Sequence, residues 1–590
     1  MTATAPSAEP VEVAEQLLAA ASDGGVERLW FTSGSDLTSL QEAEARRRAH
    51  SRGTPSIVTS PHEHVGLCAA MGEAMVRRQP SMTAVHADLG VLHQGGALHN
   101  AFRGNYPVLL LGGYPATTPE RRTASVYWKQ QRWDPGGAVR QYVKWEHRLA
   151  SHDDPALVVA RALQVAMSPP RGPAYLAVPD EVGRAPAGPA DSVAGLADVQ
   201  LPGGDHDQLE LIATRLLRAE QPLVVTDRLG DDPAVVATFD ALVEEFGLAV
   251  TSTRHRMNLR DDHPCRWHGS TLAEADAVLA VEHPVPWIPV REQPSTATWI
   301  GVVGTDPLQG EIPVYEFPAS LRLQVDPARF LMRLHETMRR LARPADRERA
   351  RERVAAWQAR IQPPRPPRRS GQPTPGDVAA GLGEVIGAED QVCWEIVDLA
   401  ALPRSRPGTL FEKGGSSLGW AVGAAVGARL GSADRPTVAV TGDGGYLMGS
   451  PASTLWLQHQ LDAPVLTVVV NNQGHRTGTQ AVAEDYPHGY AVAEDRYPGG
   501  VFDPSPDHAA HARSQGGFGA QVTDAAELVD GLRRARDAVE LERVPAVVDV
   551  RVKPHRPPRR TQDSAAPQQR RPADSWSDPP GDARHHGSEA

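Results

Sequence analysis

Gly442-Asp443-Gly444, at the end of the run Thr437-Val-Ala-Val-Thr441, is the stretch of sequence that decides the fold of this chain. A second run, Val465-Leu-Thr-Val-Val-Val470, follows it and ends in Asn471-Asn472. Such β-branched runs are typical of buried parallel strands, and residues 450–461 between them have the pattern of a helix. Because the carboxyl ends of parallel strands meet at one edge of a sheet, we expect the two polar motifs to lie together there.

The residues of these two motifs suit a diphosphate bound through a metal ion. Asp443 and Asn472 supply the carboxylate and amide oxygens that Mg²⁺ prefers as ligands. The glycines around them let backbone N–H groups approach phosphate oxygens: Gly442, Gly444 and Gly445. Gly-Asp-Gly alone also fits a tight turn after a strand, but the second motif favours the phosphate site.

Length and composition narrow the class of protein. A chain of 590 residues suits three or four domains, and a formal net charge of −12 argues against binding to nucleic acid. The widely separated Cys68, Cys265 and Cys393 offer neither a disulfide framework nor a metal-ligand spacing. The sequence has neither an apolar run of the about 20 residues that span a membrane nor a secretory signal. We therefore expect a cytoplasmic protein without a membrane partner.

Three α/β segments alternate predicted strands with predicted helices. They cover residues 1–189, 190–342 and 374–552, and the last contains the Gly-Asp-Gly motif. Residues 343–373 are a charged helix followed by a proline-rich stretch, which is typical of a stiff linker. Residues 553–590 form a basic, polar tail. The predicted fold class is therefore α/β, with three doubly wound parallel-sheet domains and a C-terminal tail.

Taken together, the paired motifs and the three-segment plan resemble the thiamine diphosphate (ThDP)-dependent enzymes. This superfamily includes acetolactate synthase, pyruvate decarboxylase, oxalyl-CoA decarboxylase and 2-hydroxyacyl-CoA lyase. The resemblance covers residues 11–552 and implies a pyrimidine-binding, a central nucleotide-binding-like and a diphosphate-binding domain, in that order. It also implies that Asp443, Asn472 and the Gly474 carbonyl hold Mg²⁺, although the longer insert between the motifs leaves Asn471 open as the alternative amide ligand.

The resemblance assigns the acid that activates the cofactor to Glu63. The family places a glutamate at the start of a helix after the second strand of the first domain, where its carboxylate favours the imino tautomer of the aminopyrimidine ring. Glu63 follows the strand-like residues 56–59 and opens an alanine-rich helical pattern. His64 departs from the glutamine that many relatives have next. An ordinary first-turn acid, favoured by the helix dipole, is the alternative for Glu63 taken alone.

A glycine- and alanine-rich segment of the third domain resembles the family's aminopyrimidine contact. Within residues 412–427, Leu418 matches the bulky apolar residue that bends the cofactor, and the Ser416 carbonyl would accept from its amino group. Bending brings the amino nitrogen against the reactive carbon, so the benefit is positional. The same composition also suits a tightly packed core helix.

The substrate side is indicated less directly. His93 and His99 lie in a stretch that replaces a glycine-rich loop of acetolactate synthases, and Gln131 stands where relatives point a glutamine at the cofactor. Residues 475–516 lack clear periodicity and, at about 40 residues, exceed an ordinary connection. Two of their carboxylates are candidates for proton transfer: Glu494 and Glu484. Each of these side chains also fits an ordinary solvated role.

Basic residues of the tail favour a CoA substrate. The tail of this acidic chain contains Arg556, Arg559 and Arg560. Arginine guanidinium groups on a proline-stiffened segment are suited to bind and cover the phosphates of CoA. Arg254 and Arg256 add positive charge in the central domain, where the resemblance leaves ADP, a CoA nucleotide, FAD or no ligand open. A disordered, solubilising tail is the alternative.

We therefore predict a ThDP- and Mg²⁺-dependent lyase that cleaves a 2-hydroxyacyl-CoA, for example 2-hydroxyisobutyryl-CoA, to a carbonyl compound and formyl-CoA. The alternative is an acetolactate synthase-like carboligase or a 2-oxo acid decarboxylase. A non-catalytic cofactor-binding subunit is disfavoured because Glu63 and both metal-site motifs are present. The resemblance further implies a homodimer or homotetramer with active sites at the interface.

Overall fold

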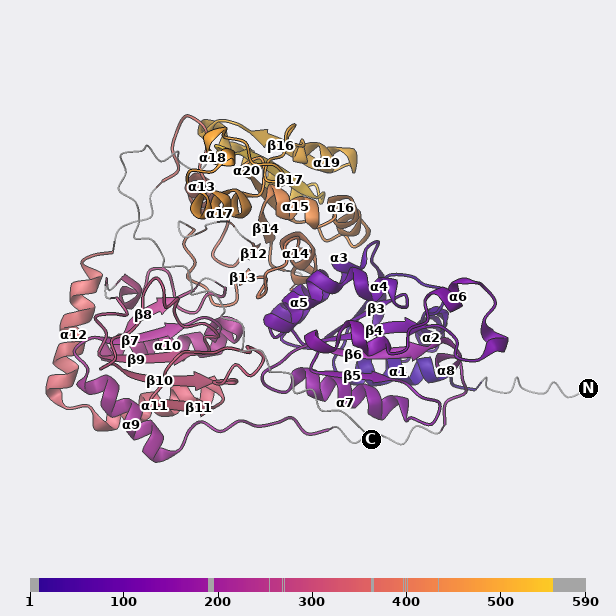
Figure 1. The fold of residues 1–590 in the computed structure, drawn as a ribbon, viewed down its shortest axis with the longest axis horizontal. Coiled ribbons are helices and arrows are strands. Elements are labelled where there is room, and N and C mark those ends of the chain that lie inside the picture. The colour runs from indigo at the N-terminus through magenta and orange to yellow at the C-terminus, as the bar shows by residue number, and fades with distance from the viewer. Residues whose placement is uncertain are drawn as a thin grey trace, which may run out of the picture. The chain divides into compact units, whose positions relative to one another are not determined.

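A computed structural model gives the fold of this chain. It describes residues 10–554, apart from 189–195, 254, 268, 270, 362–365, 396, 398, 400–401 and 433. The chain divides into two compact units, Met1–Gln473 with Pro504–Pro554 and Gly474–Asp503 with His555–Ala590. Among the described residues, no helix is both long and apolar enough to cross a membrane. The first unit contains three parallel sheets (Figure 1).

The first sheet has the strand order β2-β1-β3-β4-β6-β5. Its inner strands, such as the fully buried β4, carry apolar residues on both faces because helices cover both sides. Its strands are β1 (Arg28–Phe31), β2 (Ser56–Thr59), β3 (Ser81–Val85), β4 (Val108–Tyr114), β5 (Trp145–Arg148) and β6 (Ala174–Pro179). Its helices are α1 (Val13–Asp23), α2 (Thr38–Ala49), α3 (Glu63–Arg77), α4 (Leu89–His93), α5 (Gly95–Arg103), α6 (Val126–Lys129), α7 (Pro155–Met167) and α8 (Asp180–Gly183).

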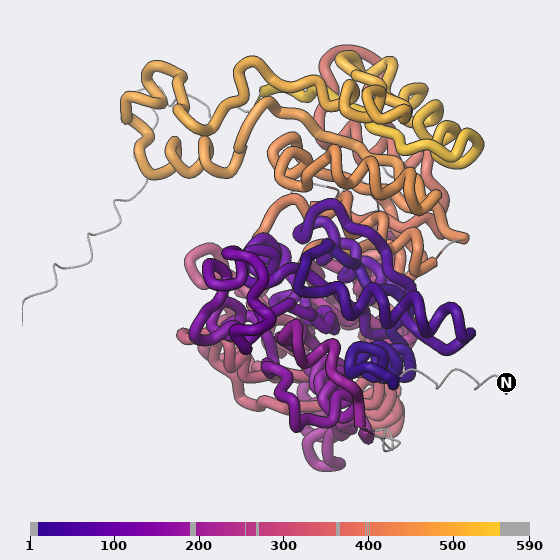
Figure 2. Tube along the Cα trace, turned by 90° about the vertical axis from the view of Figure 1, so that its right-hand side faces the viewer, coloured from indigo at the N-terminus to yellow at the C-terminus, as the bar shows by residue number. Residues whose placement is uncertain are grey.

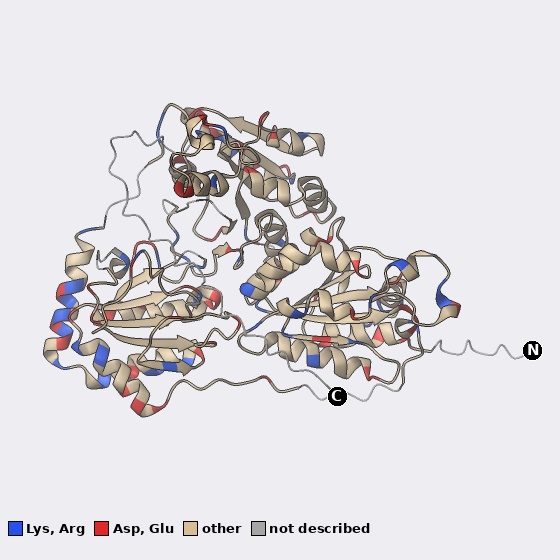
Figure 3. Cartoon of the chain, viewed as in Figure 1, with Lys and Arg blue, Asp and Glu red and all other residues tan. Residues whose placement is uncertain are grey.

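The central sheet has the order β11-β10-β9-β7-β8. Its strands are β7 (Pro222–Thr226), β8 (Ala249–Ser252), β9 (Ala277–Val281), β10 (Trp299–Gly304) and β11 (Leu321–Gln324). Its helices are α9 (His206–Arg218), α10 (Pro233–Phe246), α11 (Pro327–Leu341) and α12 (Pro344–Gln358). Charged residues gather on α9, α11 and α12, whereas the strands carry few (Figure 3).

Helix α12 lies within the segment that we predicted as a linker. Its Trp357 is buried in the hydrophobic core of the central sheet. Arg347, on the same helix, pairs with Glu245 of α10 at 3.1 Å. The helix therefore packs as part of the central domain, and only the proline-rich stretch that follows it is left as a connection.

The third sheet has the order β13-β12-β14-β15-β17-β16, so β17 lies between β15 and β16. The chain of this domain is drawn from orange to yellow in Figure 2. Its strands are β12 (Gln391–Trp394), β13 (Leu410–Glu412), β14 (Thr437–Gly442), β15 (Leu466–Asn471), β16 (Phe518–Val522) and β17 (Ala546–Arg551). Its helices are α13 (Pro375–Val385), α14 (Ala421–Gly431), α15 (Asp443–Met448), α16 (Pro451–Gln460), α19 (His508–Ser514) and α20 (Leu528–Glu540). The predicted α/β class with three parallel sheets is confirmed.

Two local predictions differ from the structure. The helix predicted over residues 450–461 is present as α16, but α15 precedes it and begins at Asp443 itself. Residues 475–516, which lack a clear pattern in the sequence, contain α19 and, in the second unit, α17 (Arg476–Asp485) and α18 (Tyr490–Ala493). α17 and α18 are mostly not buried, so they need no apolar stripe, and α19 is too short for sequence periodicity to reveal its buried side.

Candidate active site

The Gly-Asp-Gly and Asn-Asn motifs lie at the same edge of the third sheet. β14 pairs with β15 so that Gly442 stands opposite Val470, the residue before Asn471. Asp443 follows at once, is buried, and accepts a hydrogen bond from the Gly444 N–H at 3.0 Å through Oδ1. The strand–helix–strand unit predicted from the sequence therefore brings the two polar motifs together.

The two asparagines have different surroundings. Asn471 is fully buried; its Nδ2 donates to Asp549 at 2.9 Å, and its Oδ1 accepts from the Gln473 N–H at 3.0 Å. Asn472 Oδ1 is also buried, but has no hydrogen-bond partner within the described part of the chain. A buried oxygen without a partner is costly unless a ligand supplies one. The structure therefore supports Asn472, rather than Asn471, as the metal ligand.

The donor set also fits a metal ion that is bound together with a diphosphate. No three His, Cys, Asp or Glu side chains converge as a metal site in the described ranges. Asp443 and Asn472 alone would leave most positions around Mg²⁺ to other oxygens, which phosphates and water ordinarily fill. Gly474 begins the second unit, where an added Cβ would lie 2.2 Å from the Gly500 carbonyl oxygen, so only glycine fits there. Its role as a ligand remains a prediction.

Glu63 begins α3 directly after β2, in the layout that the resemblance requires. The ring of His62 caps this helix by accepting a hydrogen bond from the His64 N–H at 3.1 Å. Glu63 Oε2 lies 3.2 Å from Nδ1 of His93, and the Glu63 side chain is 14% exposed. A carboxylate that is still accessible at the edge of the sheet is placed to meet a ligand, which supports Glu63 as the acid that faces the cofactor.

A second polar group, not predicted from the sequence, lies at the same edge of the first sheet. Asp36 follows β1, and its Oδ1 forms a short contact with His86 Nδ1 just after β3. The other oxygen of Asp36 accepts from the Ala87 N–H at 2.9 Å. Gln130 Nε2 lies 2.7 Å from His86 Nε2, so both ring nitrogens have a neighbour; when His86 is charged, its Nε2–H donates, and the Gln130 amide must then present its oxygen. His86 directly follows the fully buried strand β3, so the expectation that functional polar residues follow such strands, used for Asp443 and Asn472, also points to His86.

Glycines make room for this pair, and its electrostatics favour a charged imidazole. An added Cβ at Gly113 would lie 1.9 Å from Asp36 Oδ2, and one at Gly34 would lie 2.5 Å from His86 Nδ1. The hydrogen bond with Asp36 raises the pKa of His86 above its ordinary value, against the opposing effect of burial, and the charge of Glu63 adds to the increase. His86 therefore holds a proton at higher pH than a solvated histidine does.

The aminopyrimidine-contacting segment is held by the first domain. Asn100, fully buried on α5, donates to the Ser417 carbonyl at 2.9 Å and accepts from the Ser417 N–H at 3.0 Å. His64 Nε2 lies 3.2 Å from the Gly419 carbonyl oxygen. Leu418, between these two anchors, is only partly buried, as a residue that contacts a bound ligand should be.

The structure brings the two predicted substrate histidines to the candidate site, but not Gln131. His93 Nδ1 lies 3.2 Å from Glu63 Oε2, and His99 Nδ1 lies 3.4 Å from the Ser416 nitrogen. Gln131 is exposed, and its neighbour Gln130, which ends α6, is the glutamine that is buried against His86. The structure therefore favours Gln130 over Gln131, a shift of one position that distance along the sequence does not resolve.

The arginines predicted for a CoA substrate receive no support. Arg256 is buried and donates to Asp231 of its own domain at 2.7 Å. It also donates to the Tyr106 hydroxyl of the first domain at 2.7 Å and to the Glu412 carbonyl of the third at 2.9 Å. It therefore joins three domains instead of facing a ligand. The other predicted arginines lie outside the described residues: Arg254, Arg556, Arg559 and Arg560. Glu484 and Glu494 are exposed on the second unit, so neither is shown near the site.

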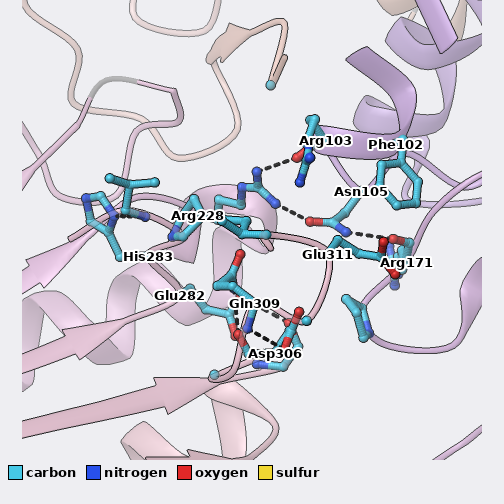
Figure 4. Close-up of a pocket in the computed structure, with 18 of the residues that line it drawn as sticks. Phe102, Arg103, Asn105, Arg171, Arg228, Glu282, His283, Asp306, Gln309 and Glu311 are labelled. Carbon is cyan, nitrogen blue, oxygen red and sulfur yellow. Dashed lines mark hydrogen bonds between the residues drawn. The ribbon is translucent and has the colours of Figure 1, made fainter. Parts of the chain in front are cut away.

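A cavity of about 790 Å³ lies at the carboxyl ends of central strands β9 and β10, next to α5 of the first domain. Arg228 reaches from its wall to Asn105 and to the main chain of Arg103 (Figure 4). Burial lowers the pKa of Lys144 to about 8 and raises that of Glu282 to about 7. Four basic side chains line the cavity: Arg103, Lys144, Arg171 and Arg228. Ligands of open α/β sheets bind at such edges.

Comparison with known proteins identifies both cofactor-binding domains. The model of the thiamine pyrophosphate enzyme N-terminal TPP binding domain matches residues 11–135, and that of the C-terminal TPP binding domain matches residues 395–550. The chain is 26% identical over 445 residues to a benzoylformate decarboxylase of Pseudomonas aeruginosa, covering 70% of this chain and 78% of that protein. It is 25% identical over 512 residues to a probable 2-ketoarginine decarboxylase of the same organism, covering 81% and 84%.

A solved structure has the same fold. The ThDP-dependent 4-hydroxybenzoylformate decarboxylase of Rhodococcus jostii superposes with a TM-score of 0.75 and 20% identity, covering 92% of this chain and 99% of that chain. The fold thus extends over nearly all of both chains, and the two matched domains are those that carry Glu63 and the Gly-Asp-Gly motif. The chain belongs to the thiamine diphosphate-dependent enzyme superfamily.

Proposed function

We propose that this protein is a ThDP-dependent decarboxylase of 2-oxo acids, which was the alternative function at the sequence level. The curated relatives are named as decarboxylases of benzoylformate and of 2-ketoarginine, both 2-oxo acids. The arginines that would favour a CoA thioester are either buried, as Arg256 is, or outside the described residues. The observation that carries the proposal is the Asp36–His86–Gln130 group beside Glu63, because decarboxylation needs a proton donor after carbon dioxide leaves.

The residues of the third domain would hold the cofactor's diphosphate. Asp443 and the unpartnered oxygen of Asn472 would bind Mg²⁺, with the Gly474 carbonyl as a further predicted ligand. Leu418, fixed between the Asn100 and His64 contacts, would support the bent form of the cofactor. When bound, ThDP supplies a carbanion that adds to the keto carbon and then accepts the electron pair left by departing carbon dioxide.

Glu63 and His86 would handle protons at separate atoms. The Glu63 carboxylate would hold the aminopyrimidine ring by a hydrogen bond, so that the ring accepts the proton of the reactive carbon. His86, whose pKa is raised by Asp36, would give a proton to the carbon from which carbon dioxide has left. Asp36 holds the imidazole by Nδ1 and Gln130 approaches Nε2, so the ring has one orientation toward the site.

The central cavity supports a second, auxiliary ligand. We propose that it takes a phosphorylated compound, such as ADP, a CoA nucleotide or FAD, because four basic side chains line a space of about 790 Å³. Arg228 is already committed to Asn105, and Lys144 donates to the carbonyls of Val165 and Ser168, which leaves Arg103 and Arg171 as the side chains to meet phosphate. Thermal stabilisation by one of these compounds, lost in Arg171→Ala, would support this role, and no shift with any of them would refute it.

A substrate panel tests the main proposal. Purified protein with ThDP and Mg²⁺ should release carbon dioxide from benzoylformate or another 2-oxo acid, and 2-hydroxyisobutyryl-CoA should remain intact. His86→Ala should lower this turnover by about 10²–10⁴-fold if His86 is the proton donor. Cleavage of the acyl-CoA without turnover of any 2-oxo acid would overturn the proposal in favour of the lyase.

A further inference from the structure

We infer that Glu395 is a positioning residue that holds the two cofactor-contacting segments of the third domain at a fixed separation. Glu395 follows β12 and is fully buried. Its backbone N–H donates to the Val440 carbonyl at 3.0 Å, which fixes it beside β14. The inference concerns how ThDP binds, so it does not depend on the identity of the substrate.

The carboxylate of Glu395 joins the two segments directly. Its Oε1 accepts from the Gly419 N–H at 3.2 Å, and its Oε2 accepts from the Trp420 N–H at 3.0 Å, immediately after Leu418. The same Oε1 accepts from the Thr441 hydroxyl at 2.7 Å, immediately before the Gly-Asp-Gly motif. One side chain therefore connects the segment that bends the cofactor to the strand end that meets its diphosphate.

The packing around Glu395 leaves no room for another arrangement. An added Cβ at Gly445 would lie 2.5 Å from Thr441 Oγ1 and 2.8 Å from Glu395 Oε1, so the diphosphate loop rests on this carboxylate. An added Cβ at Gly419 would lie 2.6 Å from the Met448 carbonyl carbon, which brings the Leu418 segment against the end of α15. These contacts make the separation of the two segments depend on the length and position of the Glu395 side chain.

Three N–H and O–H donors surround this carboxylate. Among the described residues, no basic side chain forms a direct ion pair with Glu395; burial raises its pKa, and the charge of Lys413, which pairs with Glu412, only partly opposes this effect. A buried carboxylate without a directly paired countercharge is costly to retain. Its hydrogen bonds all go to residues that flank cofactor-contacting positions, so the cost is explained by cofactor positioning.

The separation of the segments matters only for a ligand that spans both. ThDP contacts the Leu418 segment through its aminopyrimidine and the Gly-Asp-Gly motif through its diphosphate. Inorganic diphosphate needs only the second of these. Loss of the connection should therefore weaken ThDP binding and leave diphosphate binding largely unchanged.

Glu395→Gln is the direct test, because the amide keeps the shape but leaves one backbone N–H facing an NH₂ group. Calorimetric titration with Mg²⁺ present should show about 10-fold weaker ThDP binding. The affinity for inorganic diphosphate should stay within about 2-fold of the wild type. Glu542→Gln, an exposed glutamate of the same domain, serves as the matched control and should leave both affinities unchanged.

Two outcomes would overturn the inference. One is unchanged ThDP affinity in Glu395→Gln, and the other is an equal loss for ThDP and for diphosphate, which would indicate local disruption of the phosphate loop. If Glu395→Gln does not fold, Thr441→Val removes only the hydroxyl donor and should give the same selective loss of ThDP affinity at a smaller size. The titrations contain no substrate, so a wrong assignment of the reaction would not affect them.

Discussion

At the scale of single residues, the site depends on side chains in the loops and helix starts that follow neighbouring strands. Asp36 follows β1, Glu63 follows β2 and His86 follows β3, and these three strands are adjacent in the first sheet. Their carboxyl ends therefore place a first-turn helix acid and a paired histidine at one edge. In the third sheet the same rule brings Asp443 and Asn472 together, and the Asn472 amide oxygen has no hydrogen-bond partner among the described residues.

Replacement by alanine should affect different properties at the two adjacent asparagines, metal binding at Asn472 and stability at Asn471. Asn472→Ala should weaken Mg²⁺ binding in the presence of ThDP by about 10-fold or more, with little change in the stability of the apoprotein. Asn471→Ala should instead destabilise the apoprotein by about 1–3 kcal/mol, because it removes a buried donor to Asp549. Titration calorimetry and denaturant unfolding separate the two effects. A large loss of stability in Asn472→Ala would contradict the assignment.

The raised pKa of His86 gives a pH prediction with a definite sign. As the proton donor, His86 should lose activity as pH rises through its raised pKa, so Asp36→Asn should move that limb of the kcat profile to lower pH. The ion pair also stabilises the fold below the pKa of an unfolded histidine, and this contribution disappears as pH rises through the folded pKa. Asp36→Asn should therefore cost more stability at pH 5.5 than at pH 9. An equal loss of unfolding free energy at both pH values would contradict an ion pair between Asp36 and His86.

At the scale of elements, the contact between α3 and α14 brings the first and third domains together. Both helices are rich in glycine and alanine, and an added Cβ at Gly72 of α3 would lie 1.9 Å from the Ala424 carbonyl oxygen. On the other side, an added Cβ at Gly427 of α14 would lie 1.8 Å from the Ala69 carbonyl oxygen. The two backbones thus touch, and α3 begins at Glu63 while α14 follows Leu418 closely.

Adding a methyl group at this contact should force the helices apart. Gly72→Ala should destabilise the protein by about 1–3 kcal/mol and weaken ThDP binding as well. Gly376→Ala on α13, where the nearest atom to the new Cβ is 3.8 Å away, is the matched control. It should be neutral or stabilising by up to about 1 kcal/mol, because alanine favours a helix more than glycine does. Denaturant unfolding measures both, and a neutral Gly72→Ala would contradict the close contact.

Elements with a strong local signal were predictable from the sequence. The apolar runs before Gly442 and Asn471 are strands β14 and β15, because parallel strands that are covered on both faces need apolar residues throughout. Glu63 was predictable since a helix start after a strand is also local. His86 was not, because its partner Asp36 lies 50 residues earlier and only the folded sheet places them together.

The structural role of Arg256 could not be predicted from the sequence, because it also depends on residues far away in the chain. Arg256 has the charge that a phosphate ligand would require, and nothing in its neighbours distinguishes a ligand site from a buried anchor. The structure shows it committed to Asp231, Tyr106 and the Glu412 carbonyl. Burial and partner choice are set by three domains packing together, and the sequence of one segment does not contain that information.

At the scale of the whole molecule, the two matched cofactor-binding domains lie on either side of the central domain in the chain. Arg256, from the central domain, contacts Tyr106 of the first and Glu412 of the third, so the central domain also connects them physically. Among the described residues the Asn472 oxygen has no partner and His86 is paired with Asp36, which fits a cofactor-binding site with a proton donor; decarboxylation of a 2-oxo acid is the reaction that we propose for it. A homodimer or homotetramer, with each site shared between chains, stays a prediction.

The most direct measurement of this reaction is the yield of carbon dioxide and aldehyde from benzoylformate, with purified protein, ThDP and Mg²⁺. We predict equal amounts of the two products and a loss of about 10²–10⁴-fold in rate for Glu63→Gln, with ThDP still bound. Formyl-CoA from a 2-hydroxyacyl-CoA, together with no carbon dioxide from benzoylformate, pyruvate or 2-ketoarginine, would contradict the proposed function.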